Sequence, residues 1–122
     1  MSARKQPQVA VLGAGNWGTT VAQMIATNGH AVTLWCRRAA QAKEINGRHT
    51  NEKYLPGIEL SSSIRATHNL HEAIAAVPLL FLIVPTKSFR QVCAAAGDVL
   101  SPEQFVVHGS KGFENGTRYR MS

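Results

Sequence analysis

The sequence contains no apolar stretch long enough to cross a membrane. Its longest apolar run, AIAAVPLLFLIV at 73–84, is interrupted by Pro78 and falls short of the ~20 residues that a transmembrane helix needs. Residues 1–8, MSARKQPQ, are basic but contain no apolar segment of the kind found in secretory signals. We therefore expect a cytoplasmic protein that has no membrane contact.

Motifs that bind metals or activate nucleophiles are also missing. The two cysteines, Cys36 and Cys93, lie on separate predicted elements without CxxC spacing, which is typical of reduced thiols. The five histidines form no HExxH motif or catalytic triad. His68 and His71 share one face at a helix start, but surface histidines at this spacing are more often uncommitted. The sequence therefore predicts no metal site.

Acidic residues are few, and the basic residues that outnumber them are scattered. The 122 residues include 13 Lys and Arg against 7 Asp and Glu, giving a net charge of +6. No basic stripe interleaved with aromatic residues indicates a nucleic-acid surface, whereas a small phosphorylated ligand needs only two or three of these charges. With 44% hydrophobic residues and mean hydropathy −0.10, the chain has the composition of one globular domain.

What the sequence does contain is a regular alternation of strand and helix patterns. Short β-branched or apolar runs predict strands at 8–13, 31–36, 63–67, 78–84 and 103–110. Helical spacing predicts helices at 16–28, 39–47, 68–77 and 86–100, with an ordered loop at 48–60. This order is typical of an α/β fold in which a mostly parallel, doubly wound sheet of Rossmann type is covered on both faces.

Several details of these elements are specific enough to be checked. Gly29 is expected to stop the first helix, and the second helix is expected to end at Gly47. Asn69 is expected to cap the third helix in a capping box with Glu72. The strand at 78–84 is expected to be buried on both faces.

The final residues, GFENGTRYRMS at 112–122, leave a strand and begin another helical pattern. No closing element follows it. We therefore expect residues 1–122 to be the front part of a longer protein.

The stretch GAGNWG at 13–18 is the first candidate functional site. It follows a predicted strand and opens a helix, the context in which a GxGxxG motif predicts dinucleotide binding. Gly13 would permit the tight turn, Gly15 would let the backbone approach a pyrophosphate, and Gly18 would let helix and strand pack closely. The alternative is a glycine-rich turn without a ligand.

Two arginines stand where an acidic residue would select NAD. The end of the second predicted strand reads LWCRR, with Arg37 and Arg38 at the position that usually bonds the ribose 2′-hydroxyl. Guanidinium groups suit a 2′-phosphate. We therefore expect NADP(H) to be preferred, with NAD(H) still possible. The alternative is that both arginines are solvated residues at the start of the next helix.

Five motifs in order resemble the soluble NAD(P)-dependent glycerol-3-phosphate dehydrogenases. They are GAGNWGT (13–19), NGHAVTLWCRR (28–38), NEKYLPGIEL (51–60), IVPTKSFRQV (83–92) and SKGFENGTRYRMS (110–122). The YLPG and KG segments are far more specific than the glycines alone.

The resemblance implies the reversible NAD(P)H-dependent reduction of dihydroxyacetone phosphate to sn-glycerol 3-phosphate, a reaction of glycerophospholipid synthesis. It places Lys111 at the junction of cofactor and substrate as a catalytic residue. It implies that residues 1–122 are the incomplete N-terminal NAD(P)-binding domain, and that a substrate-binding helical domain outside this chain carries further catalytic and phosphate-binding residues. A homodimer is a possible form of the full-length protein. The cofactor site that it implies consists of Gly13, Gly15, Asn16, Trp17, Gly18, Arg37, Arg38, Tyr54 and Lys111.

Other interpretations remain open at this point. The chain could be a stand-alone dinucleotide-binding module without catalysis, or an inactive remnant. Another dehydrogenase built on the same sheet is a third possibility, against which the YLPG and SKGFE segments argue. For Trp17, packing against the sheet is as good an interpretation as a place beside the pyrophosphate.

Overall fold

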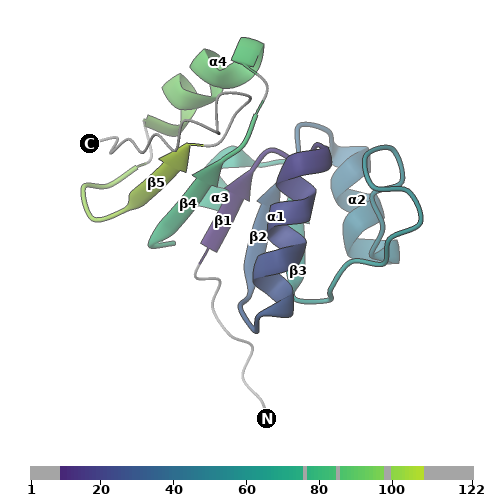
Figure 1. The fold of residues 1–122 in the computed structure, drawn as a ribbon. Coiled ribbons are helices and arrows are strands. Elements are labelled where there is room, and N and C mark those ends of the chain that lie inside the picture. Colours follow the sequence, from purple (N-terminus) through teal and green to yellow (C-terminus); the bar gives the residue numbers. More distant parts are fainter. Residues whose placement is uncertain (1–8, 76, 85, 98–99, 109–122) are drawn as a thin grey trace.

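The computed structural model describes residues 9–75, 77–84, 86–97 and 100–108 (Figure 1). Five strands alternate with four helices along this part of the chain. In order they are β1 Val9–Leu12, α1 Asn16–Thr27, β2 Val32–Trp35, α2 Ala39–Arg48, β3 Ile64–Thr67, α3 Leu70–Ile74, β4 Leu79–Leu82, α4 Thr86–Gly97 and β5 Phe105–His108.

The strands form one sheet in the order β3-β2-β1-β4-β5, and every pairing is parallel. The chain moves from β1 outward to β3 and then returns to place β4 on the other side of β1. This reversal beside β1 is the switch point at which open α/β sheets bind their ligands. The predicted Rossmann-type architecture is therefore confirmed.

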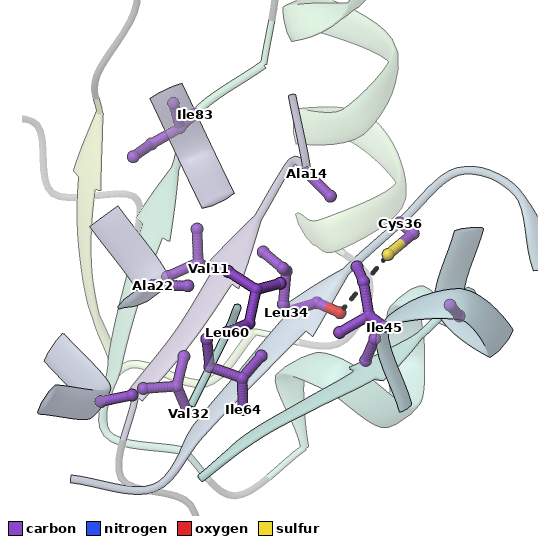
Figure 2. Close-up of a cluster of buried hydrophobic side chains, with 13 residues drawn as sticks. Val11, Ala14, Ala22, Val32, Leu34, Cys36, Ile45, Leu60, Ile64 and Ile83 are labelled. Atoms are coloured by element: carbon purple, nitrogen blue, oxygen red, sulfur yellow. Dashed lines mark hydrogen bonds between the residues drawn. The ribbon is translucent and has the colours of Figure 1, made fainter. Parts of the chain in front are cut away.

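Helices cover the two faces of the sheet, and each face has its own apolar core. On one face, α1 and α2 enclose a cluster that includes Val11, Leu34 and Ile45 (Figure 2). On the other face, α3 and α4 enclose a second cluster around Ile74 and Leu80. Strands β1 and β2 are buried along their whole length, as expected for central parallel strands with both faces covered.

Strand β4 is shorter and less buried than the sequence predicted. It spans Leu79–Leu82, and its side chains alternate between half-buried and buried. Leu80 and Leu82 belong to the core beneath α3 and α4, whereas Leu79 and Phe81 point to the face of α1 and α2. Those two helices pack on β1, β2 and β3, so Leu79, Phe81 and the neighbouring Phe105 (57% exposed) keep part of their surface in solvent.

Helix α3 spans five residues, Leu70–Ile74, where ten were predicted. Asn69 caps it as expected, because its side chain accepts a hydrogen bond from the Glu72 amide (3.0 Å). The Glu72 carboxylate accepts from the Thr67 hydroxyl (3.0 Å) rather than closing the capping box. The chain leaves the helical conformation at Ala75, whose ψ is 125°, and Val77, the residue before Pro78, is buried in the core.

The ends of α1 and α2 lie close to the predicted positions. Gly29 follows the C-cap of α1 with φ +96°, as predicted. Helix α2 ends at Arg48, one residue later than predicted. The left-handed residue that ends α2 is His49, with φ 58°. Leu60 donates a hydrogen bond to the His49 carbonyl (2.7 Å), which helps to fix this unusual conformation.

Candidate dinucleotide site

The loop between β1 and α1 is closed tightly around two of its three glycines. Gly13 has φ +123°, and a Cβ atom there would fall on the carbonyl oxygen of Ile83, which follows β4. A Cβ atom on Gly18 would fall on the carbonyl oxygen of Gly13. Both obstacles are backbone atoms, so neither can move aside without shifting the sheet. Glycine is therefore required at these positions for the fold itself.

Gly15 differs from the other two glycines because the space beside it is open. A Cβ atom on Gly15 would meet no heavy atom within 4 Å. Gly15 is also the N-cap residue of α1, with extended backbone angles, and Thr19 donates to its carbonyl (3.0 Å). The first amides of a helix carry partial positive charge and lack intrahelical acceptors. An anion could therefore approach the backbone here without meeting a side chain.

The end of β2 brings Arg37 and Arg38 to the same edge of the sheet. Leu12 and Trp35 are register partners, and the Gly13 amide donates to the Trp35 carbonyl (3.1 Å). Both arginines follow Trp35 within three residues and are exposed. Arg38 is also the N-cap residue of α2. This edge therefore offers two exposed cations next to the strand that pairs with β1, and no acidic side chain from LWCRR.

The loop from 49 to 60 supplies the third part of this edge. The Asn16 side chain donates to the Tyr54 carbonyl (2.8 Å), so Tyr54 lies beside the first turn of α1. Tyr54 is half-buried, and the Lys53 ammonium lies 5.5 Å from the centre of its ring. Trp17, on the same first turn, is 44% exposed and so is not a core residue. Trp35, by contrast, is buried and donates to the His68 carbonyl (3.1 Å).

Comparison with known proteins decides the family. A family model described as the N-terminus of NAD-dependent glycerol-3-phosphate dehydrogenase matches residues 8–122. The chain belongs to this family. A curated glycerol-3-phosphate dehydrogenase (NAD(P)+) of Halalkalibacterium halodurans is 52% identical over 114 residues, which cover 93% of this chain and 33% of that protein. The chain thus spans about a third of the length of the curated relatives it matches.

Solved structures agree with this assignment. Glycerol-3-phosphate dehydrogenase from Saccharomyces cerevisiae superposes with a TM-score of 0.81 at 28% identity, covering 88% of this chain and 34% of that chain. The enzyme from Coxiella burnetii gives a TM-score of 0.80 at 28% identity, covering 90% of this chain and 34% of that chain. The fold predicted from the strand and helix pattern is therefore the one this glycerol-3-phosphate dehydrogenase family uses.

The structure brings together most, but not all, of the residues that the family resemblance suggested. The three glycines, Asn16 and Trp17 form one loop and helix start, and Tyr54 is bonded to it. Arg37 and Arg38 follow the neighbouring strand. Lys111, expected to be catalytic and to reach the substrate, lies outside the described residues.

Three polar residues that hold the glycine loop in place could not be inferred from the sequence. Asn51 and Thr19 are buried, and Gln41 is half-buried. Their side chains form hydrogen bonds with one another and with the Ala14 carbonyl. Asn51 begins the family motif NEKYLPGIEL, but a single sequence does not reveal which backbone group its amide contacts. The tertiary structure alone assigns these partners.

Within residues 9–75, 77–84, 86–97 and 100–108, no three His, Cys, Asp or Glu side chains are grouped so that they could hold a metal ion. No helix in these ranges is long and apolar enough to cross a membrane. His68 and His71 are both exposed.

The two thiols differ in their surroundings, and burial raises the pKa of both. Cys36 lies in the core on the α1 side, where its Sγ faces the Leu34 carbonyl at 4.0 Å (Figure 2). Burial raises the pKa of Cys36 to about 12 from an ordinary 9.0. Burial also raises the pKa of the half-buried Cys93 thiol. Neither environment activates a thiolate.

Cys36 should make the fold sensitive to alkaline pH. Its thiol stays protonated in the folded state while the unfolded chain ionises above pH 9.0. The free energy of unfolding should therefore be unaffected by this group below pH 9.0 and fall between pH 9 and 12, by up to about 1.4 kcal/mol per pH unit. Urea denaturation at pH 8, 9 and 10 measures this. The Cys36→Ala variant should have the shallower slope, and equal slopes would contradict the assignment.

Proposed function

We propose that this chain is the dinucleotide-binding part of a glycerol-3-phosphate dehydrogenase. The observation that carries the proposal is the difference among the three glycines of one loop. Side chains at Gly13 and Gly18 would strike backbone, whereas the space at Gly15 is open. A loop that served only as a tight turn would need glycine at positions 13 and 18, where a side chain would strike backbone. It would not need glycine at position 15, where a side chain has room. A pyrophosphate fits the open position and the helix start behind it.

The cofactor proposed for this site is a nicotinamide dinucleotide, NAD(P)(H). The curated relatives carry NAD(P)+ in their names, and we propose that this chain prefers NADP(H). Arg37 and Arg38 support that preference because guanidinium groups form charge-assisted hydrogen bonds with phosphate. Asn16, Trp17 and Tyr54 are proposed to line the remainder of the site.

The reaction proposed for the whole enzyme is the reversible reduction of dihydroxyacetone phosphate to sn-glycerol 3-phosphate, a step of phospholipid synthesis. The bound nicotinamide supplies or accepts the hydride. Lys111 is proposed to contact cofactor and substrate, where its ammonium would stabilise negative charge on the reacting oxygen. We propose residues 1–122 as the N-terminal domain, with further substrate-binding residues in the part that only the longer relatives show. The cytoplasmic location and the homodimer stay predictions.

Titration of the 122-residue chain with NADPH and with NADH tests the binding half of the proposal. Tryptophan fluorescence should change saturably, because Trp17 is exposed on the helix turn that follows Gly15. NADPH should bind more tightly than NADH. A chain that is folded by circular dichroism yet binds neither nucleotide would contradict the proposal.

A chimera tests the catalytic half. Residues 8–122 would replace the matching third of the Halalkalibacterium halodurans relative, with which they share 52% identity. The chimera should reduce dihydroxyacetone phosphate with NADPH as reductant. A chimera that binds NADPH without turnover would instead favour the non-catalytic binding module.

A further inference from the structure

Asn51 is a buried polar residue in a loop, and it uses both hydrogens of its amide. It is 1% exposed and lies 37 residues from Ala14 in sequence. Its Nδ2 donates to the Ala14 carbonyl (3.1 Å) and to the Thr19 hydroxyl oxygen (2.8 Å). Its Oδ1 accepts from Gln41 Nε2 (3.2 Å). Such a satisfied buried amide fixes the groups that it contacts.

The group that Asn51 fixes belongs to the glycine loop itself. The Ala14 carbonyl receives a second hydrogen bond from Gln41 Nε2 at 2.7 Å. The Ala14–Gly15 peptide bond is trans, so its carbonyl and its amide point in opposite directions. The side-chain amides of Asn51 and Gln41 hold the Ala14 oxygen on the α2 side of this peptide. They therefore also hold the Gly15 N–H so that it points away from α2. A flipped peptide would instead present an oxygen to an approaching anion.

The same residue connects the glycine loop to Tyr54. The backbone carbonyl of Asn51 accepts from the amides of Tyr54 (3.1 Å) and Leu55 (2.7 Å). Asn16 completes the connection from the other side, because its side chain donates to the Tyr54 carbonyl (2.8 Å). Segments 14–19 and 51–55 thus form a closed ring of hydrogen bonds.

We propose that Asn51 is a positioning residue of the dinucleotide site. Its side-chain amide holds the Ala14–Gly15 peptide with the N–H turned toward the pyrophosphate position, and it keeps Tyr54 in register with the glycine loop. Asn51 itself touches no part of the cofactor. This inference rests on the proposed function, because it assigns a role within the same site.

The test compares Asn51→Asp with the parent chain in NADPH titrations, under conditions where circular dichroism shows both to be folded. Aspartate keeps the size of the side chain but replaces both donors with an oxygen that faces the Ala14 carbonyl. NADPH affinity should fall about tenfold or more, as expected when two hydrogen bonds to the loop are lost. Affinity for adenosine 2′-monophosphate, which lacks the pyrophosphate, should change less than threefold.

Asn46→Ala is the matched control. Asn46 is also an asparagine whose side chain forms two hydrogen bonds with the backbone, both to Ala66 at 2.8 Å, but these anchor β3 to α2. Its loss should lower stability without changing NADPH affinity. An equal loss of affinity in both variants would show a structural role only and would overturn the inference.

Gln41→Met provides a second route should Asn51→Asp fail to fold. It removes the other hydrogen bond to the Ala14 carbonyl from a half-buried position, and NADPH affinity should fall in the same selective way. If Asn51→Asp folds and its NADPH affinity is unchanged, the inference is overturned while the proposed function stays intact. If Asn51→Asp does not fold, unchanged NADPH affinity in Gln41→Met has the same meaning. A folded parent chain that binds no NADPH would instead overturn the proposed function and, with it, this inference.

Discussion

The Gly18→Ala variant should be less stable than the parent chain by about 3 kcal/mol. The Gly15→Ala variant, by contrast, should fold normally but bind NADPH more weakly. A methyl group on Gly18 would overlap the Gly13 carbonyl oxygen, and overpacking against fixed backbone costs about 1–3 kcal/mol or more. At Gly15 the methyl group meets open space, so stability should stay within about 0.5 kcal/mol. That same methyl group would occupy the approach to the helix start, and NADPH affinity should fall roughly tenfold or more.

Urea denaturation and NADPH titration of both variants measure these two effects. Gly47→Ala is the control, because Gly47 lies within α2 and a Cβ atom there would also meet nothing within 4 Å. It should bind NADPH normally and gain about 0.5–1 kcal/mol from the higher helix propensity of alanine. Normal NADPH binding by Gly15→Ala would show that the open position is not where the pyrophosphate lies.

Removing both arginines at the end of β2 should abolish the preference for NADPH. In the Arg37→Ala/Arg38→Ala variant, the 2′-phosphate loses two charge-assisted hydrogen bonds, each contributing about 1.5 kcal/mol or more. NADPH affinity should therefore fall roughly 100-fold. NADH, which has no 2′-phosphate, should bind within about threefold of its parent affinity. Competitive titration with both nucleotides measures the ratio.

A second double variant separates a local contact from the overall positive charge. Arg48→Ala/Arg65→Ala also removes two positive charges, but at the end of α2 and in β3, where both arginines are exposed. It should weaken NADPH binding only slightly, and less at 150 mM salt, because separated surface charges are screened. Similar losses in the two double variants would mean that the net charge of +6, rather than these two side chains, attracts the nucleotide.

Where the controlling interactions are local, the sequence predicted the structure well. The glycine loop, the start of α1 and the stop at Gly29 all depend on backbone angles and amides within a few residues. The Asn69 cap is local for the same reason. Alternating strand and helix patterns were enough to predict the parallel sheet, because a parallel pair requires a crossover and the crossovers here are helices.

Predictions failed where neighbouring segments compete or where packing decides. Helix α2 ends at Arg48, one residue beyond the predicted Gly47, and the left-handed residue that follows is His49, whose carbonyl accepts a hydrogen bond from Leu60 eleven residues later. Helix α3 stops at Ile74 because the chain turns out of the helix at Ala75, with ψ 125°, and Val77 then packs into the core. The burial of β4 depends on which helices cover each face, and a strand's own residues do not specify this.

The sequence by itself determined the family and the order of elements, because its motifs and its strand and helix patterns can be recognised from neighbouring residues. It also predicted a loop that could hold a pyrophosphate. Only the tertiary structure decided which glycine is open, since the obstacles at Gly13 and Gly18 include a carbonyl that follows β4. It also decided that Asn51 supports Ala14 from 37 residues away. An amide side chain has the same donors and acceptors wherever it stands, and the fold chooses the partners that it meets.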